Sequence, residues 1–167
     1  MMTLPAGLGW TKPAAGGGGG PGAHDYWRLL ITLPDGSGSF CGLTELELRA
    51  TPGGSDLTNP TFAVGSVDGS SAINGDNLAR FAFDDSLTTG WLSATAATSW
   101  VSWNFAAFGT AKEVLQIAIT GSWNAPDASP RNFELQWSDD ASAWTTCMTV
   151  TGETGWTGSG DTRLFNV

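Results

Sequence analysis

The residues that could do chemistry in this chain of 167 residues are mostly carboxylates. There are 16 Asp and Glu residues but only one His, His24, which precedes the first strand-like segment. A nucleophile that needs a histidine base therefore finds none inside the domain, and two Cys with one peripheral His do not match a zinc site of known spacing. Two carboxylates facing each other across a cleft would still suffice for a glycosidase. However, many acids lie in turns such as Pro34-Asp35-Gly36, where Asp bonds its own backbone. We therefore expect a non-enzymatic protein.

The composition indicates one globular domain. The chain is 41% hydrophobic, with 9 Trp and 8 Phe, and only 14% of its residues are charged. Gly, Pro and Asp interrupt every apolar run, so no segment is long enough to span a membrane. The 7 basic and 16 acidic residues give a net charge of -9, which repels a polyanion. We expect neither membrane insertion nor nucleic-acid binding.

A change in composition divides the chain near its N-terminus. The Gly-rich run from Pro13 to Gly22 cannot pack a core and is typical of a linker. We therefore assign residues 1–23 to an arm with its linker and residues 24–167 to the domain. The arm is too short to bury its apolar residues Leu4, Leu8 and Trp10, so Met1–Trp10 is predicted to anchor a partner chain. It lacks a basic region and a sustained apolar region, so we expect no secretory signal.

Beyond the linker, apolar residues recur at every second position, which is the pattern of β-strands. Leu46 and Leu48 alternate with Glu45, Glu47 and Arg49, which predicts that the charged residues face solvent. The other inward-facing sets are Trp27, Leu29, Ile31 and Leu33; Val101, Trp103 and Phe105; Leu115, Ile117 and Ile119; Phe133, Leu135 and Trp137; and Trp144, Thr146 and Met148. Many short strands separated by Gly-, Asp- and Ser-rich turns predict an all-β, antiparallel sandwich.

Three blocks in this order resemble one known family. They are Ala82-Phe-Asp-Asp-Ser-Leu-Thr-Thr-Gly-Trp91, the Trp-led segment Trp100–Phe105, and Pro130-Arg-Asn-Phe-Glu-Leu-Gln-Trp-Ser-Asp-Asp-Ala-Ser-Ala-Trp144. They are similar to the motifs of discoidin-like domains, also called coagulation-factor type C or galactose-binding-like domains, and the resemblance covers about Tyr26 to Val167. It implies an eight-stranded jelly roll. Asp85 and Ala141 stand where the family usually has Gly, which leaves open how these two tight turns are built.

The resemblance also implies a structural calcium site. Sugar-binding members of the family often hold Ca²⁺ in the corresponding loop with an Asp, a Thr hydroxyl and backbone carbonyls, which are hard oxygen ligands. In this chain Asp84 and Thr89 correspond to that Asp and that Thr. Ser86 stands where the family usually has an acidic or amide residue, which is a better ligand. The alternative is a turn closed by Asp84 without a metal.

The first and last strands of several members of the family are neighbours. Cys41 and Cys147 therefore either form a disulfide or remain two buried thiols.

The predicted ligand site lies in loops at one end of the domain. The family places Trp91 in the core, whereas Trp123 lies between two strands with polar neighbours. A sugar stacks its C–H face on such a ring while its hydroxyl groups bond nearby polar side chains. The alternative is that Trp123 folds back to cap the sandwich. The loops Val67–Asn77 and Ser93–Ser99 are expected at the same end of the domain. The predicted ligand-binding residues are Trp123, Asn124, Asp127, Arg131, Asn74, Asp76 and Asn77.

The N-terminal region favours a role on a virus particle. A free-standing module with a short arm and a Gly-rich run resembles accessory proteins of phage tails, fibres and head spikes. Residues 23–32 and 43–58 are similar to the openings of such virion proteins. We therefore expect a virion surface protein, released by lysis, that contacts other virion proteins through Met1–Trp10 and binds a host surface polysaccharide. One alternative is a purely structural virion protein that binds no sugar. Another is an accessory of a carbohydrate-degrading enzyme.

Overall fold

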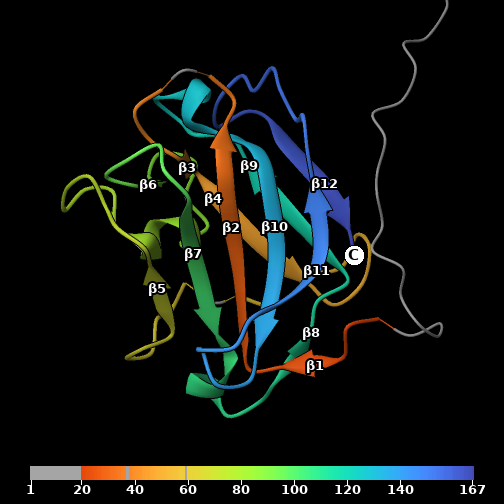
Figure 1. The fold of residues 1–167 in the computed structure, drawn as a ribbon. Helices are drawn as coiled ribbons and strands as arrows, with labels where there is room; N and C mark the ends of the chain where they lie inside the picture. The colour runs from red at the N-terminus through yellow and green to blue at the C-terminus, as the bar shows by residue number, and fades with distance from the viewer. Residues whose placement is uncertain (1–19, 37, 59) are drawn as a thin grey trace, which may run out of the picture.

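The computed structural model describes residues 20–36, 38–58 and 60–167, so the predicted anchor Met1–Trp10 lies outside the described residues. Its regular elements are short antiparallel strands and single turns of 3-10 helix (Figure 1). The strands are β1 (Ala23–His24), β2 (Tyr26–Pro34), β3 (Gly42–Leu43), β4 (Glu45–Arg49), β5 (Val67–Gly69), β6 (Trp91–Leu92), β7 (Ser99–Asn104), β8 (Lys112–Glu113), β9 (Gln116–Thr120), β10 (Pro130–Ser138), β11 (Thr145–Val150) and β12 (Thr162–Asn166). The 3-10 turns are η1 (Ala79–Ala82), η2 (Phe105–Phe108) and η3 (Pro126–Ala128). No helix in the described ranges is long and apolar enough to cross a membrane.

Two sheets form the layers of the fold. The larger has the order β11-β10-β2-β7-β5, and the smaller, β12-β9-β4, lies behind it in Figure 1. The nine-residue strand β2 is central because it pairs with both β10 and β7. The predicted antiparallel β-sandwich is confirmed. The count of eight strands is not, since the described residues also form the short ribbons β1–β8 and β3–β6.

The core fills the space between the two sheets, as the alternation predicts. Trp27, Leu29 and Ile31 of β2 are fully buried, and Leu46 and Leu48 of β4 are 1% exposed. Further buried side chains come from the other strands and from the segment before β6, namely Val101, Trp103, Ile117, Ile119, Phe133, Leu135, Phe165, Phe83 and Trp91. A buried Trp removes a large apolar area from water, so these residues dominate the stability of the sandwich.

Leu33 departs from the predicted pattern. Its side chain is 41% exposed, and the following residue, Pro34, is buried instead. The pairing of β2 with β10 shifts register beside it, between Pro130 and Asn132 and again before Phe133. A register irregularity exchanges the two faces of a strand. The prediction that Leu33 faces the core is therefore wrong.

The last two predicted core Trp residues are only partly buried. Trp137 stacks on the His24 ring, with ring centroids 3.5 Å apart and planes 6° apart. Trp144 precedes β11, and the Arg28 guanidinium lies 4.1 Å from its ring centroid. Arg28 and Gln136 belong to β2 and β10, and their side chains bond each other at 2.7 Å. Trp144 therefore covers the outer face of the large sheet and does not enter the core.

The described chain is held to the domain from its first residues. The Gly22 N–H donates to Glu113 Oε1, and β1 pairs with β8. The His24 ring lies 2.9 Å from Asp139 Oδ1 through Nδ1 and 2.8 Å from the Pro21 carbonyl through Nε2. These contacts position the end of the Gly-rich run at the corner where β1 begins.

The two cysteines are free thiols. Cys41 is fully buried, and Cys147 is partly buried with its Sγ 3.3 Å from the Leu135 carbonyl. Burial raises the pKa of Cys41 to about 11 and that of Cys147 to about 12. Because the thiolate is the reactive form, both side chains are poor nucleophiles at neutral pH.

The turns at Asp85 and Ala141 adopt the backbone conformation that Gly favours. Their φ angles are 57° and 59°, in the left-handed region. The left-handed conformation costs a non-glycine residue roughly 1–2 kcal/mol. Around Ala141 the Asp140 carboxylate offsets part of that cost, because it accepts the N–H groups of Ser142 and Ala143 at 2.8 Å each. These bonds hold the pKa of Asp140 well below its usual range.

Replacing Ala141 by Gly is expected to stabilise the protein. The substitution removes the strain of the left-handed conformation. This effect exceeds the destabilisation from the greater entropy of the unfolded chain, so the free energy of unfolding should rise by about 0.5–1 kcal/mol. Chemical denaturation of wild type and Ala141→Gly measures this difference. Ala143→Gly, in the same loop without a positive φ, is the control and should be slightly destabilising. A loss of stability in both variants would contradict the strain argument.

Candidate functional site

The loop before β6 is closed by one carboxylate. Asp84 accepts the Ser86 N–H at 3.1 Å and the Thr89 hydroxyl at 2.8 Å. Asp85 takes the left-handed conformation between them. The two predicted metal ligands, Asp84 and Thr89, are therefore brought together. Their mutual hydrogen bond matches the turn without a metal that the sequence analysis kept as the alternative.

Glu45, the first residue of β4, adds a second carboxyl group at this loop. It is only 4% exposed, and neither carboxylate oxygen has a hydrogen-bond partner among the described residues. Burial raises its pKa to about 9, and the negative charges of Asp84, Asp85 and Asp56 add to the shift. The Asp85 backbone offsets part of the shift without forming a hydrogen bond of normal geometry. A buried carboxyl group without partners is costly.

Sequence reasoning missed Glu45. Alternation placed it with Glu47 on the solvent side of β4, and Glu47 does lie there, bonded to Arg49 at 2.6 Å. Glu45 is on the same side of the strand, but the loop containing Asp84 and Asp85 covers it. No local signal in the sequence indicated this burial, because Glu45 and Glu47 occupy equivalent positions in the alternation.

The oxygen atoms at this loop fit a hard cation. In the described part of the chain, no three His, Cys, Asp or Glu side chains are grouped as metal ligands. Calcium also accepts hydroxyl and carbonyl oxygens, so the Glu45 and Asp84 carboxylates with the Thr89 hydroxyl would form part of such a site. The orphaned oxygens of Glu45 are the observation that favours an ion.

Trp123 lies at the same end of the domain. Its side chain is 42% exposed, and a Cβ added at Gly90 would lie 3.1 Å from Trp123 Cδ1. The indole thus covers the backbone immediately before Trp91. Its loop is fixed at both ends, because Thr44 Oγ1 donates to the Gly121 carbonyl at 2.7 Å and the Ser122 N–H donates to Ser129 Oγ at 2.9 Å. Trp123 is therefore a positioned, partly open aromatic surface.

The other predicted ligand residues divide into three groups. Asn124, Asp127 and Arg131 are exposed in or just after the Trp123 loop. Asp127 packs against the neighbouring turn, where its carbonyl accepts the Gly36 N–H at 2.9 Å. On the other side of the site, Asn74 and Asp76 are exposed, and Asn74 Oδ1 accepts the Asp76 N–H at 2.9 Å. These five residues are accessible to a ligand.

Asn77 has a different position. It is 7% exposed, and its side-chain Nδ2 donates to the Gly90 carbonyl at 3.4 Å. Its backbone carbonyl accepts the Leu92 N–H. Asn77 therefore supports the backbone under Trp123 and is not an open ligand contact, because its amide is already used to satisfy buried backbone.

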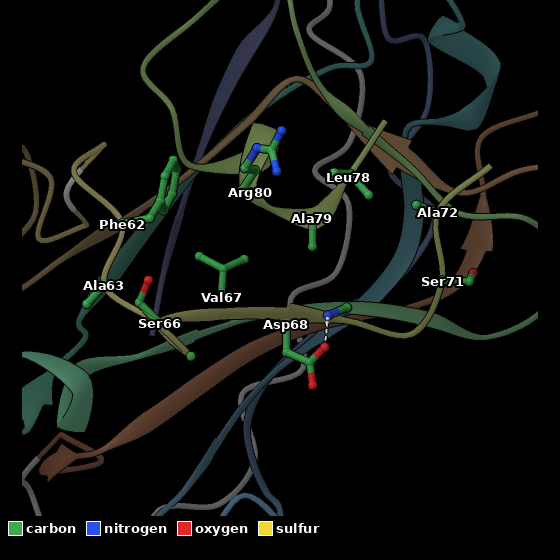
Figure 2. Close-up of a pocket in the computed structure, with 12 residues that line it drawn as sticks. Phe62, Ala63, Ser66, Val67, Asp68, Ser71, Ala72, Leu78, Ala79 and Arg80 are labelled. Carbon is green, nitrogen blue, oxygen red and sulfur yellow. Dashed lines mark hydrogen bonds between the residues drawn. The ribbon is translucent and has the colours of Figure 1, made fainter. Parts of the chain in front are cut away.

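A hollow of about 410 Å³ lies beside β5 and η1, apart from Trp123 (Figure 2). In Figure 2, Val67 and Ala79 point toward each other across it, and Phe62 stands at one side. The Asp68 carboxylate turns away from Val67 and accepts the Gly69 N–H at 2.8 Å. The lining of the hollow combines apolar side chains, such as Phe62, Val67 and Leu78, with polar ones, among them Asp68 and Arg80. No sequence pattern indicated this hollow.

The comparisons identify the family. The model of the F5/8 type C domain matches residues 66–167, which is more than half of the chain. The chain therefore belongs to the F5/8 type C, or discoidin-like, family, whose domain is a carbohydrate- and ligand-binding module. The matched region contains Asp84, Thr89 and Trp123 but not Glu45. No curated protein and no solved structure matches the chain.

The buried Glu45 predicts a pH dependence of the metal-free protein. Its folded pKa of about 9 lies above the ordinary glutamate value of 4.5, so the folded state holds a proton that the unfolded state releases between these pH values. Stability should therefore fall as pH rises from about 5 to 9, by at most about 1.4 kcal/mol per unit. Denaturation in chelator across this range measures it. Glu45→Gln should flatten the profile, and an equally steep profile in that variant would contradict the assignment.

Proposed function

We propose that this protein is a non-enzymatic surface protein of a phage or phage-like particle that docks through Met1–Trp10 and binds a host-cell glycan. Family membership supports a binding module, and the partly open Trp123 is the observation that carries the glycan site. Its indole is fixed over Gly90, and the exposed polar side chains Asn124 and Asp127 follow it in the same loop. An aromatic face beside hydrogen-bonding groups is the usual arrangement for a sugar.

A calcium ion at the Asp84 loop would serve this site structurally. Gly90 follows Thr89 and lies under Trp123, so the loop that would hold the ion also supports the aromatic surface. When bound, the ion would neutralise Glu45 and Asp84, which stand unpaired with any basic side chain in the described ranges. The proposed role is therefore to hold the loop, and sugar contact is left to Trp123.

Calcium is expected to raise the melting temperature. A ligand that binds only the folded state stabilises it by mass action, by about 2.7 kcal/mol at a concentration one hundred times its Kd. Melting curves in calcium and in chelator measure the effect. Glu45→Gln should reduce the calcium-dependent shift, because it removes a carboxylate that would bind the ion. Glu47→Gln on the same strand is the matched control and should retain the shift. Identical curves for wild type in both buffers would leave Asp84 as a turn residue.

Replacing Trp123 by Ala should abolish glycan binding without unfolding the domain. Binding by a single copy is expected to be weak, with a Kd on the order of 0.1–1 mM, because an open loop site excludes little water; many copies on one particle would raise the avidity. A glycan array on wild type identifies the sugar, and titration compares the variants.

The matched control is Phe108→Ala. Phe108 is 41% exposed, close to the value for Trp123. It belongs to η2, the turn directly after β7, whereas Trp123 lies between β9 and η3; the turn after β7 and the loop after β9 are at opposite ends of the sandwich (Figure 1). Phe108→Ala should retain glycan binding. Trp103→Ala, which empties a buried Trp site, should instead cost about 3–5 kcal/mol of stability. Unchanged glycan binding by Trp123→Ala would place the site elsewhere, and no binding by wild type would favour a purely structural role.

A further inference from the structure

We propose that the hollow beside β5 binds residues Ala6–Lys12 of a neighbouring copy as an added β-strand. This inference rests on the proposed docking role of Met1–Trp10, and it names the surface that the arm contacts. Copies of the protein would then join through arm exchange. Four features support it: a sheet edge without a strand partner, apolar side chains in the hollow beside that edge, the residue pattern of the arm, and the charges of the two parts.

The sheet edge is available for pairing. β5 is the last strand of the large sheet, and the described residues form no bridge on its outer side. The Ser66 carbonyl accepts the Asn104 N–H at 2.7 Å, and the Ser70 N–H donates to the Trp100 carbonyl at 2.9 Å. Backbone groups of successive residues in a strand point to opposite edges, so Val67 directs its N–H and C=O to the outer edge of β5, where the Gly69 N–H is bonded to Asp68 Oδ1. An extended peptide can pair with such an edge.

Apolar side chains surround this edge. Val67 and Ala79 point into the hollow, and Phe62 forms one side (Figure 2). Val64, in the turn that leads to β5, is fully exposed, with a relative accessibility of 103%. Exposed apolar groups around a concave surface are typical of contact sites for another polypeptide. The hollow therefore fits apolar side chains carried by an added strand.

The arm has a segment with the matching pattern. Ala6–Lys12 lies between Pro5 and Pro13 and contains no proline, so each of its residues can donate a backbone hydrogen bond. Leu8 and Trp10 are two positions apart and would share one face of a strand. Two apolar side chains on one face suit the apolar side chains that line part of the hollow.

Charge complements this fit. Residues 1–23 contain one basic residue, Lys12, and no acidic residue, whereas the remaining 6 basic and 16 acidic residues give the domain a net charge of -10. The arm is therefore attracted to the domain surface. The hollow itself is lined by one acidic and one basic side chain, Asp68 and Arg80, so the attraction comes from the net charge of the domain.

Geometry favours a neighbouring copy as the donor of the arm. Gly20 packs beside Glu113 and Leu115, and the segment that enters β1 lies at the opposite edge of the large sheet from β5 (Figure 1). The two outer strands of this five-stranded sheet, β11 and β5, are about 19 Å apart. A Gly-rich coil of the length that separates Lys12 from Gly20 averages only about 16 Å. Reaching the hollow of the same chain would require a stretched path around the domain.

Disulfide trapping in the full-length chain tests the proposal. Chains with Leu8→Cys are mixed with chains carrying Ala79→Cys and oxidised, and the products are separated without reducing agent. The native thiols are buried with raised pKa values, so they should not compete. We expect a cross-linked heterodimer, and Trp10→Ala in the first chain should reduce its yield several-fold.

The control partner carries Ala143→Cys, an exposed position in the loop before β11. Equal trapping by Ala79→Cys and Ala143→Cys would overturn the proposal. Trapping only within a chain that carries both Leu8→Cys and Ala79→Cys would overturn the exchange between copies. Neither result affects the glycan site, which the Trp123 variants test separately. A particle that still incorporates residues 20–167 would instead refute the docking role of the arm.

Discussion

Packing of aromatic side chains between two sheets of unequal width is the interaction on which this structure depends. Trp27 and Trp103 are register partners on β2 and β7 and are both buried. Phe133 of the large sheet meets Phe165 of the small sheet edge to face, with ring centroids 5.1 Å apart. This contact fixes the two layers face to face, so their ends and edges remain available for loops. Because five strands face three, β5 extends past the smaller sheet, and the turn η1 packs beside it and leaves the hollow.

In the Asp84 loop, one interaction stabilises the turn while the resulting burial of a carboxyl group destabilises it. Its turn is stabilised by the bond between Asp84 and Thr89, but the same closure covers Glu45 and brings carboxyl groups together in a protein of net charge -9. Burial and like charge both disfavour ionisation of Glu45. The metal-free domain resolves the conflict by keeping a proton, and an ion would resolve it by supplying positive charge. The energetics of this loop are therefore linked to the position of Gly90 and of the indole above it.

The two proposed contact regions use different parts of the sandwich. The proposed glycan site would consist of loops whose backbone is held by bonds such as those of Thr44 and Ser129, so its aromatic surface is preorganised. The hollow instead uses the backbone of a sheet edge and apolar side chains. Separate locations would allow the proposed particle protein to assemble through one region while the other remains free. Many joined copies would compensate for weak binding by each one.

The sequence by itself determined the strands and the core. Alternation correctly placed Trp27, Val101 and Leu135 inside, because a strand between sheets has one buried face. The discoidin-like motifs also brought Asp84 and Thr89 together correctly, since both lie in one short turn. The left-handed turns at Asp85 and Ala141 were located by the motif, although their conformation was left open.

Only the tertiary structure decided which residues a distant segment covers. Glu45 is buried because the loop before β6 folds over the first residue of β4, and no local pattern records that contact. Leu33 turns outward because the register between β2 and β10 shifts, and Trp144 stays outside because Arg28 on another strand holds it. Asn77 is enclosed for the same reason, since it bonds the backbone beneath Trp123. Periodicity specifies the face of a single strand, whereas burial, charge and access at a site depend on neighbours that lie far away in the chain.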